Sequence, residues 1–181
     1  MDELIDILDT EGNPTGKTAM KIEAHKNGWF HQTVHIWFYT TNGEILMQLR
    51  GKDKDIHPLL WDVSVAGHIG AGEAIEIAAI REIEEEIGIK IKIEQLEKIG
   101  VFKSVQKHSS NLIDCEFHHT FMSTLNIPFE KLIKQESEVE GLKLVSINQF
   151  RAELIHIKKS NYVPHSPMYY ETIYTQIKKK L

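Results

Sequence analysis

The chain of 181 residues has the length of one domain, and its 41% hydrophobic and 26% charged residues are typical of a globular protein with a full core. A net charge of −5 offers no basic face for nucleic acid, and no segment approaches the roughly 20 apolar residues of a membrane helix. The single cysteine, Cys115, excludes an intramolecular disulfide and is typical of a reducing compartment. The N-terminus is acidic and has no apolar run of signal length, so we expect a cytoplasmic protein without nucleic-acid or membrane partners.

Alternating hydrophobic residues and turn residues divide the chain into short strands and a few helices. The predicted strands cover residues 4–8, 30–41, 44–50, 61–66, 89–107, 112–124 and 142–147. The predicted helices cover residues 75–87, 129–134, 148–156 and 168–180, and residues 20–26 form a short segment of unassigned type. The predicted connections are turns at 11–16 and 108–111, a loop at 157–167, and a type I′ hairpin turn at Asn42-Gly43. Strands on both sides of a central helix, with further helices late in the chain, predict a mixed sheet covered on both faces.

The predicted helix 75–87 carries three carboxylates at i, i+3 and i+4, which places them on one face: Glu82, Glu85 and Glu86. The opposite, core-facing side is predicted to carry three isoleucines: Ile80, Ile83 and Ile87. Gly88 stands where a left-handed residue would end the helix. Like charges on adjacent turns repel, so this face predicts a hard divalent cation such as Mg²⁺ between them. The alternative is a solvated acidic face.

The three glutamates belong to a longer pattern, G-x5-E-x7-R-E-U-x-E-E-x-G-U, in which U is a bulky aliphatic residue. Its fixed positions are Gly67, Glu73, Arg81, Glu82, Ile83, Glu85, Glu86, Gly88 and Ile89. At all nine positions the chain resembles the Nudix hydrolases. The resemblance implies an α/β/α sandwich with a mixed central sheet, formed by a single domain over residues 1–181 with its Nudix box at 67–89.

The resemblance also implies the roles of the box residues. A Mg²⁺ or Mn²⁺ ion is expected on Glu82, Glu85 and Glu86, with the Gly67 carbonyl as a fourth contributor. We expect Arg81 to orient the glutamates through bidentate bonds and Glu73 to fix the junction between loop and helix. The predicted catalytic set is Glu85, Glu86, Arg81 and Glu116. For the general base Glu85 is the first choice, and the other candidates are Glu116, Glu138 and Glu140.

Outside the box the chain resembles a Nudix subgroup that includes type I isopentenyl-diphosphate isomerase. The likeness covers residues 9–16, 25–31, 61–68 and the acidic pair at 114 and 116. In those isomerases three histidines and two glutamates cage a divalent metal, and the matching positions here are His25, His31, His68, Asp114 and Glu116. His25 and His31 stand one residue closer than in that pattern, and Asp114 replaces a glutamate. The resemblance implies a second divalent metal, for which imidazoles suit Mn²⁺, Zn²⁺ or Fe²⁺; the alternative is a coincidence among ten histidines.

The isomerase reaction itself is not expected. It moves protons at carbon with a cysteine that precedes the Gly-His pair, and this chain has Ala66 there. Alanine neither donates nor accepts a proton. Cys115 does not occupy that position.

The sequence therefore predicts a divalent-metal-dependent hydrolase of a diphosphate linkage, in a nucleoside diphosphate joined to another group or in a related organic pyrophosphate. The alternatives are an isomerase-like enzyme and a non-catalytic sensor of nucleotides or diphosphates. Its expected partner is a small-molecule diphosphate. Residues 162–167 are interpreted as either a pocket wall or a connector, and Tyr169, Tyr170 and Tyr174 as either a homodimer contact or packing on the sheet.

Overall fold

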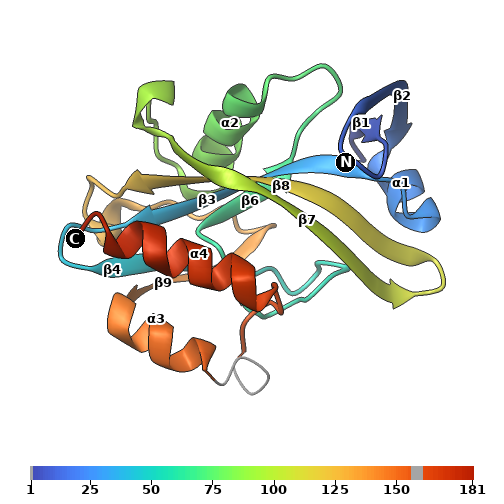
Figure 1. Cartoon of the computed structure of the whole chain (residues 1–181). Coiled ribbons are helices and arrows are strands. Elements are labelled where there is room, and N and C mark those ends of the chain that lie inside the picture. The colour runs from blue at the N-terminus through green and yellow to red at the C-terminus, as the bar shows by residue number, and fades with distance from the viewer. Residues whose placement is uncertain (1, 156–160) are drawn as a thin grey trace.

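The computed structural model describes residues 2–155 and 161–181, which form an α/β/α sandwich around a mixed sheet (Figure 1). The strands are β1 (Leu4–Leu8), β2 (Pro14–Met20), β3 (His31–Tyr39), β4 (Glu44–Arg50), β5 (Trp61–Asp62), β6 (Val65–His68), β7 (Glu97–Ser109), β8 (Leu112–Thr124) and β9 (Val139–Ser146). The helices are α1 (Lys21–Asn27), α2 (Ile75–Ile87), α3 (Ile147–Leu154) and α4 (Pro167–Lys178). The sheet runs β5-β4-β3-β8-β7, with β6 beside β3 and β9 beside β4, while β1 and β2 form a separate hairpin. The predicted fold class is confirmed.

The two faces of the sheet are covered by different helices (Figure 1). One face packs on α2 through a cluster that includes Phe38, Ile83 and Ile87. The other face packs on α3 and α4 through a cluster that includes Trp37 and Phe150. The predicted alternation of the 30–41 strand is therefore confirmed, because successive β3 side chains enter opposite layers.

Strand β3 is the centre of the sheet and pairs differently along its two edges. One edge pairs in parallel with β8 along its whole length, from His31 opposite Glu116 to Tyr39 opposite Thr124. The other edge pairs first with β6 and then, at Tyr39, with β4. The predicted strand 61–66 is accordingly broken into β5 and β6. At the break, the buried Ser64 hydroxyl donates to the Leu46 carbonyl at 2.5 Å and accepts from the Phe38 N–H at 2.8 Å. A side chain thus replaces the missing ladder bonds between β3 and β4.

The interior face of α2 differs from the prediction at one position. Ile83 and Ile87 are fully buried, whereas Ile80 lies in a shallow surface depression with Ile77 and Glu84. The core positions are occupied by Ala78 and Ala79 instead. Glu82 and Glu86 are also buried, so the inner face of the helix includes these two glutamates and excludes Ile80. Gly88 ends the helix at φ 72°, as predicted.

The hairpin turn at Asn42-Gly43 is not of type I′, which needs positive φ at two residues. Only Gly43 has positive φ, at 82°, and its N–H donates to the Thr40 carbonyl. The Thr40 N–H in turn donates to the Glu44 carbonyl, so the loop has three residues and a left-handed glycine at its end. The predicted turn at 11–16 is also shorter, because β2 begins at Pro14.

Three further boundaries differ from the prediction. The strand predicted from residue 89 begins only at Glu97, after a short 3-10 turn at Ile93–Gln95. The helix predicted at 129–134 is a 3-10 turn at Phe129–Lys131, and Pro167 belongs to α4 rather than to the preceding loop. The predicted end of the 148–156 helix lies outside the described residues. In the described part of the chain, no helix has the length and apolar character to cross a membrane.

Candidate functional site

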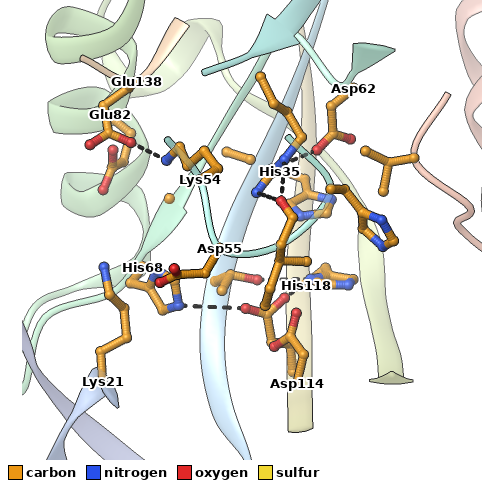
Figure 2. A pocket seen from close by; sticks show the side chains of 18 of the residues that line it. Lys21, His35, Lys54, Asp55, Asp62, His68, Glu82, Asp114, His118 and Glu138 are labelled. Carbon is orange, nitrogen blue, oxygen red and sulfur yellow. Dashed lines mark hydrogen bonds and ion pairs between the residues drawn. The ribbon is translucent and has the colours of Figure 1, made fainter. Parts of the chain in front are cut away.

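A cavity of about 460 Å³ opens between the sheet, α2 and the β4–β5 connection. Sheet alternation directs a row of polar side chains into it, from Glu116 and His118 on β8, Thr33 and His35 on β3, and His68 on β6. In Figure 2, Glu82 and His68 lie on one side of this cavity and Asp62 and His118 on the other. Three groups of residues line it: the α2 glutamates, a histidine–carboxylate cluster, and a group of imidazoles near Asp62.

The first group surrounds Gly67, where β6 passes α2. A Cβ atom at this position would lie 2.0 Å from Cδ of Glu82, so only glycine lets the carboxylate approach the strand. Glu86 is buried and accepts from the Gln48 amide at 3.0 Å and from the Ala66 N–H at 3.1 Å. Glu85 is half-exposed and lines the same cavity. The structure thus brings the three predicted glutamates and Gly67 together.

Arg81 connects the loop to these glutamates. Its guanidinium binds both carboxylate oxygens of Glu73, at 2.9 and 3.0 Å, and donates to the His68 carbonyl at 2.9 Å. Its Nη1 also donates to Glu82 at 2.7 Å and to Glu85 at 3.1 Å. The bidentate partner is therefore Glu73, which itself accepts from the Gly70 N–H and so fixes the start of the loop. Arg81 lies between the loop and two of the glutamates, in a position to orient them.

The buried glutamates are electrostatically costly. Burial raises the pKa of Glu82 to about 7, against the opposing effect of Arg81. Burial, together with the charge on Glu82, raises the pKa of Glu86 to about 8. Arg81 binds Glu82 but makes no hydrogen bond to Glu86. The two buried carboxyls, with Glu85 beside them, form a set of oxygen ligands that a divalent cation would stabilise.

The second group is a histidine–carboxylate cluster from four separate elements. One ligand atom each from His25 (α1), His31 (β3), His68 (β6) and Glu116 (β8) lies within 4.8 Å of the other three. His31 Nε2 and His68 Nε2 lie 3.4 and 3.5 Å from the same oxygen of Glu116. Asp114 lies 3.8 Å from His25 Nε2 but is not part of that set of four. The segment of unassigned type at 20–26 is α1, and this helix supplies His25.

Several polar atoms of this cluster are buried and, in the described part of the chain, have no hydrogen-bond partner. They include Nε2 of His25, His31 and His68. Nδ1 of His31 lies 2.9 Å from the Trp29 carbonyl, which can only accept, so that nitrogen carries the proton and Nε2 keeps its lone pair. An imidazole held in this way from behind is the usual arrangement of a metal ligand. The donor set fits a divalent transition metal.

The protonation states of the cluster also fit a site for a divalent metal. Burial lowers the pKa of His25 and holds that of His68 well below its ordinary value, so both rings favour the neutral, ligating form. Burial opposes ionisation of Glu116, but its contacts with the surrounding imidazoles, first His31 and then His118, hold its pKa well below the usual range. Burial and the neighbouring Glu116 raise the pKa of Asp114 to about 9.

The third group, which we call the imidazole end, consists of His35, His118 and His165. The His35 and His118 rings stack at a centroid distance of 4.1 Å, and His165 meets His35 edge-on at 5.3 Å. Asp62 fixes His165 at 2.8 Å, and Arg50 binds the other Asp62 oxygen at 3.0 Å. Burial holds the pKa of His35 well below its ordinary value and lowers that of His118 to about 4.

The imidazole end was missed by the sequence analysis. His35 and His118 continue the alternation that places His31 and Glu116 in the cavity, so that alternation was the available signal. His165 comes from the segment 162–167, which forms a wall of the cavity through Val163 and His165, as one of its two interpretations stated.

The remaining predicted residues are distributed between the cavity, the core and the surface. Glu138 lines the cavity and pairs with Lys54, whereas Glu140 is exposed and outside it. Tyr169 and Tyr170 are buried on the sheet, as the packing alternative stated. The predicted homodimer stays a prediction.

Comparison with known proteins connects this geometry to a family. A family model described as the NUDIX domain matches residues 29–165. Nudix hydrolase 3 of Arabidopsis thaliana is 36% identical over 168 residues, which cover 91% of this chain but only 22% of the plant protein. Isopentenyl-diphosphate Delta-isomerase 2 of Photorhabdus laumondii is 32% identical over 152 residues, which cover 84% of this chain and 82% of that protein. A crystal structure of a Deinococcus radiodurans protein superposes with a TM-score of 0.70 over 98% of both chains, at 17% identity, and this likeness concerns the fold.

Proposed function

The chain belongs to the NUDIX domain family of Nudix hydrolases, and we propose that it is a divalent-metal-dependent hydrolase. Its proposed substrate is a nucleoside diphosphate joined to another group, or a related organic pyrophosphate, and the bond that it splits is the diphosphate linkage. Family membership, with isomerases among the relatives, confirms the resemblance predicted from the box and from the residues around it.

The observation that carries this proposal is the pair of buried carboxyls beside Gly67. Glu82 and Glu86 are 7% and 4% exposed, and both titrate near neutral pH because burial disfavours their charge. Ionising two buried carboxyls costs free energy, which a bound cation would offset. We assign Mg²⁺ or Mn²⁺ to Glu82, Glu85, Glu86 and the Gly67 carbonyl, because hard cations prefer oxygen ligands. When bound, such a cation neutralises phosphate oxygens and makes an adjacent water more acidic.

The chain's own residues then supply position and proton transfer. Water forms a bond to one phosphorus, the bridging P–O bond breaks, and the bridging oxygen leaves with the other phosphate. We assign the water proton to Glu85, because this half-exposed glutamate faces the cavity, whereas Glu86 is engaged by two donors. Arg81 keeps Glu82 and Glu85 in place. Glu116 is assigned to the neighbouring cluster.

That cluster is proposed as a second divalent-metal site of His25, His31, His68 and Glu116, with Asp114 at its margin. The unpartnered Nε2 atoms and the proton fixed on Nδ1 of His31 support this assignment. Metal content of protein purified without chelator, measured by mass spectrometry, tests it. We expect His31→Phe to lose one metal equivalent and the variant of an exposed histidine, His108→Phe, to lose none.

The hydrolase proposal is tested by a phosphate-release screen over nucleotide sugars, nucleoside di- and triphosphates, dinucleotides and coenzyme A, with Mg²⁺ and Mn²⁺ in parallel. We expect Glu85→Gln to abolish turnover, and Glu84→Gln to preserve it. Glu84 is an exposed neighbour on α2 that pairs with Lys90 and does not line the cavity. A Glu85→Gln protein as active as the wild type would refute the assignment, and tight binding without release would favour the sensor.

Isomerase chemistry is the second candidate, favoured by the Photorhabdus relative and by the histidine cluster. Against it, Ala66 lines the cavity with a methyl group and cannot exchange a proton with carbon. Incubation of the protein and metal with isopentenyl diphosphate tests this candidate. Formation of the allylic isomer would support it, and unchanged substrate would dismiss it.

A further inference from the structure

Gln48 on β4 is a buried polar residue to which the proposed hydrolysis assigns no task. It is 3% exposed and shares a face of the sheet with Leu46, which is fully buried in the core between the sheet and α2. Gln48 is not one of the described residues that line the cavity, so it is not placed to touch a substrate. An amide in such an apolar layer is unfavourable unless its polar atoms find partners.

The two polar atoms of the Gln48 amide are used differently. The nitrogen donates to Glu86 Oε2 at 3.0 Å. The oxygen, Oε1, is buried and has no hydrogen-bond partner in the described part of the chain. An unpaired buried acceptor lowers stability, so an apolar side chain of similar size, such as methionine, would suit this layer at least as well. The stability of the fold therefore gives no reason for an amide here, whereas its contact with Glu86 does.

That contact favours one orientation of the Glu86 carboxylate. Oε2 of Glu86 accepts from the Gln48 amide and also from the Ala66 N–H, at 3.1 Å. Among the described residues nothing donates to Oε1 of Glu86, and Glu86 lines the cavity. Two donors on one oxygen, from β4 and from β6, hold the carboxylate against rotation. The other oxygen stays available to a cation.

We propose that Gln48 is a positioning residue that holds Glu86 with Oε1 toward the bound cation, and this rests on the proposed function. Gln48 acts on metal affinity through Glu86 and contacts neither cation nor substrate. A hydrogen-bonded neighbour that orients a metal ligand typically contributes about 10- to 100-fold to metal affinity. Because Glu82 and Glu85 are also assigned to the cation, the loss of this one bond should weaken binding without abolishing it.

Equilibrium dialysis of the wild type and of Gln48→Met against Mg²⁺, after removal of metal by a chelator, tests this inference. Mg²⁺ reports on the glutamates rather than on the histidine cluster, because it prefers oxygen ligands. We expect the Kd for Mg²⁺ to rise by about tenfold or more in Gln48→Met. In a chelator, the urea midpoint of this variant should equal or exceed that of the wild type, since the unpaired Oε1 is gone. If Gln48→Met does not fold, Gln48→Asn takes its place, because its shorter amide cannot reach Glu86 and should weaken Mg²⁺ equally.

The matched control is Gln32→Met. Gln32 is a half-buried glutamine on β3, on the same face of the sheet as Gln48. Among the described residues, the α2 glutamates accept from Gln48, Ala66 and Arg81 and not from Gln32, so this variant should bind Mg²⁺ like the wild type.

Three results would overturn the positioning role of Gln48 while the hydrolase proposal stands. One is wild-type affinity for Mg²⁺ in Gln48→Met, and another is an equal loss of affinity in Gln32→Met. The third is a loss of affinity in Gln48→Met together with a lower urea midpoint in the chelator, which would make Gln48 a structural residue. A wild type that binds no Mg²⁺ would overturn both the positioning role and the metal assignment of the proposed function.

Discussion

Replacing Glu86 with glutamine should stabilise the metal-free protein while it weakens metal binding. Glu86 is 4% exposed, and burial together with the charge of Glu82 raises its pKa from an ordinary 4.5 to about 8. Its partners, the Gln48 amide and the Ala66 N–H, are both donors. A glutamine oxygen can accept from both, so the substitution removes the charge and keeps the hydrogen bonds.

The sign and size follow from proton linkage. A carboxyl whose pKa is higher in the folded than in the unfolded state binds more protons when folded, so stability falls as pH rises between the two values. The contribution of Glu86 to the free energy of unfolding is fully present below pH 4.5 and is lost as the pH rises to about 8. The rise from 4.5 to about 8 corresponds to about 5 kcal/mol, of which about 3 kcal/mol is lost above pH 6.

Urea unfolding in a chelator, at pH 6 and at pH 9, measures this effect. The free energy of unfolding of Glu86→Gln, relative to that of the wild type, should increase by about 3 kcal/mol between the two pH values. Glu84→Gln removes the same charge from the exposed side of the same helix and should show no such growth. An advantage of Glu86→Gln that is equal at both pH values would refute the reasoning. With Mn²⁺ present the order should reverse, because the wild type gains binding energy that the variant has lost.

The other predictions concern glycine and arginine in the box. Gly67→Ala should lower kcat/KM by about 100-fold or more, because the alanine Cβ would displace the Glu82 carboxylate. The circular dichroism spectrum of this variant should stay native, and a variant with wild-type activity would contradict the prediction. Gly88→Ala should lower the free energy of unfolding, measured in urea, by about 1–2 kcal/mol and leave the metal content unchanged. The reason is that Gly88 has a φ of 72° and that an alanine Cβ would lie 2.8 Å from the Cβ of Ile133. Arg81→Lys cannot form the bidentate bond and should lose about 1–3 kcal/mol of stability, which thermal unfolding measures; unchanged stability would argue against its positioning role.

The sequence was most informative where chemistry and periodicity coincide. The α2 boundaries were predicted because the spacing of Glu82, Glu85 and Glu86 and the closing Gly88 constrain a helix from both its face and its end. The same helix was misread at Ile80, because an isoleucine at helical spacing looks like core whichever way the helix is rotated. Its rotation is set by two buried glutamates, and burial of a charged residue is not visible in a pattern.

Long-range assembly was the part that the sequence alone could not supply. The histidine cluster was predicted only through a family resemblance, because its members come from α1, β3, β6 and β8, and only strand pairing brings them together. The imidazole end had no such resemblance to reveal it. The side chain of Ser64, which bridges the split between β3 and β4, likewise acts on backbone groups whose need arises only in the folded sheet.

Ala66 lies between the α2 glutamates and the imidazole end of the cavity. Its N–H donates to Glu86, while across the β3–β6 ladder it stands opposite His35. A thiol here would place an ionisable group between the carboxylates and the imidazoles, where proton transfer to carbon would have its acid. A methyl group instead leaves the carboxylates as the proton acceptors beside the proposed diphosphate position. Under the proposed function, the cavity is therefore better equipped for cleavage of a phosphorus–oxygen bond than for proton transfer at carbon.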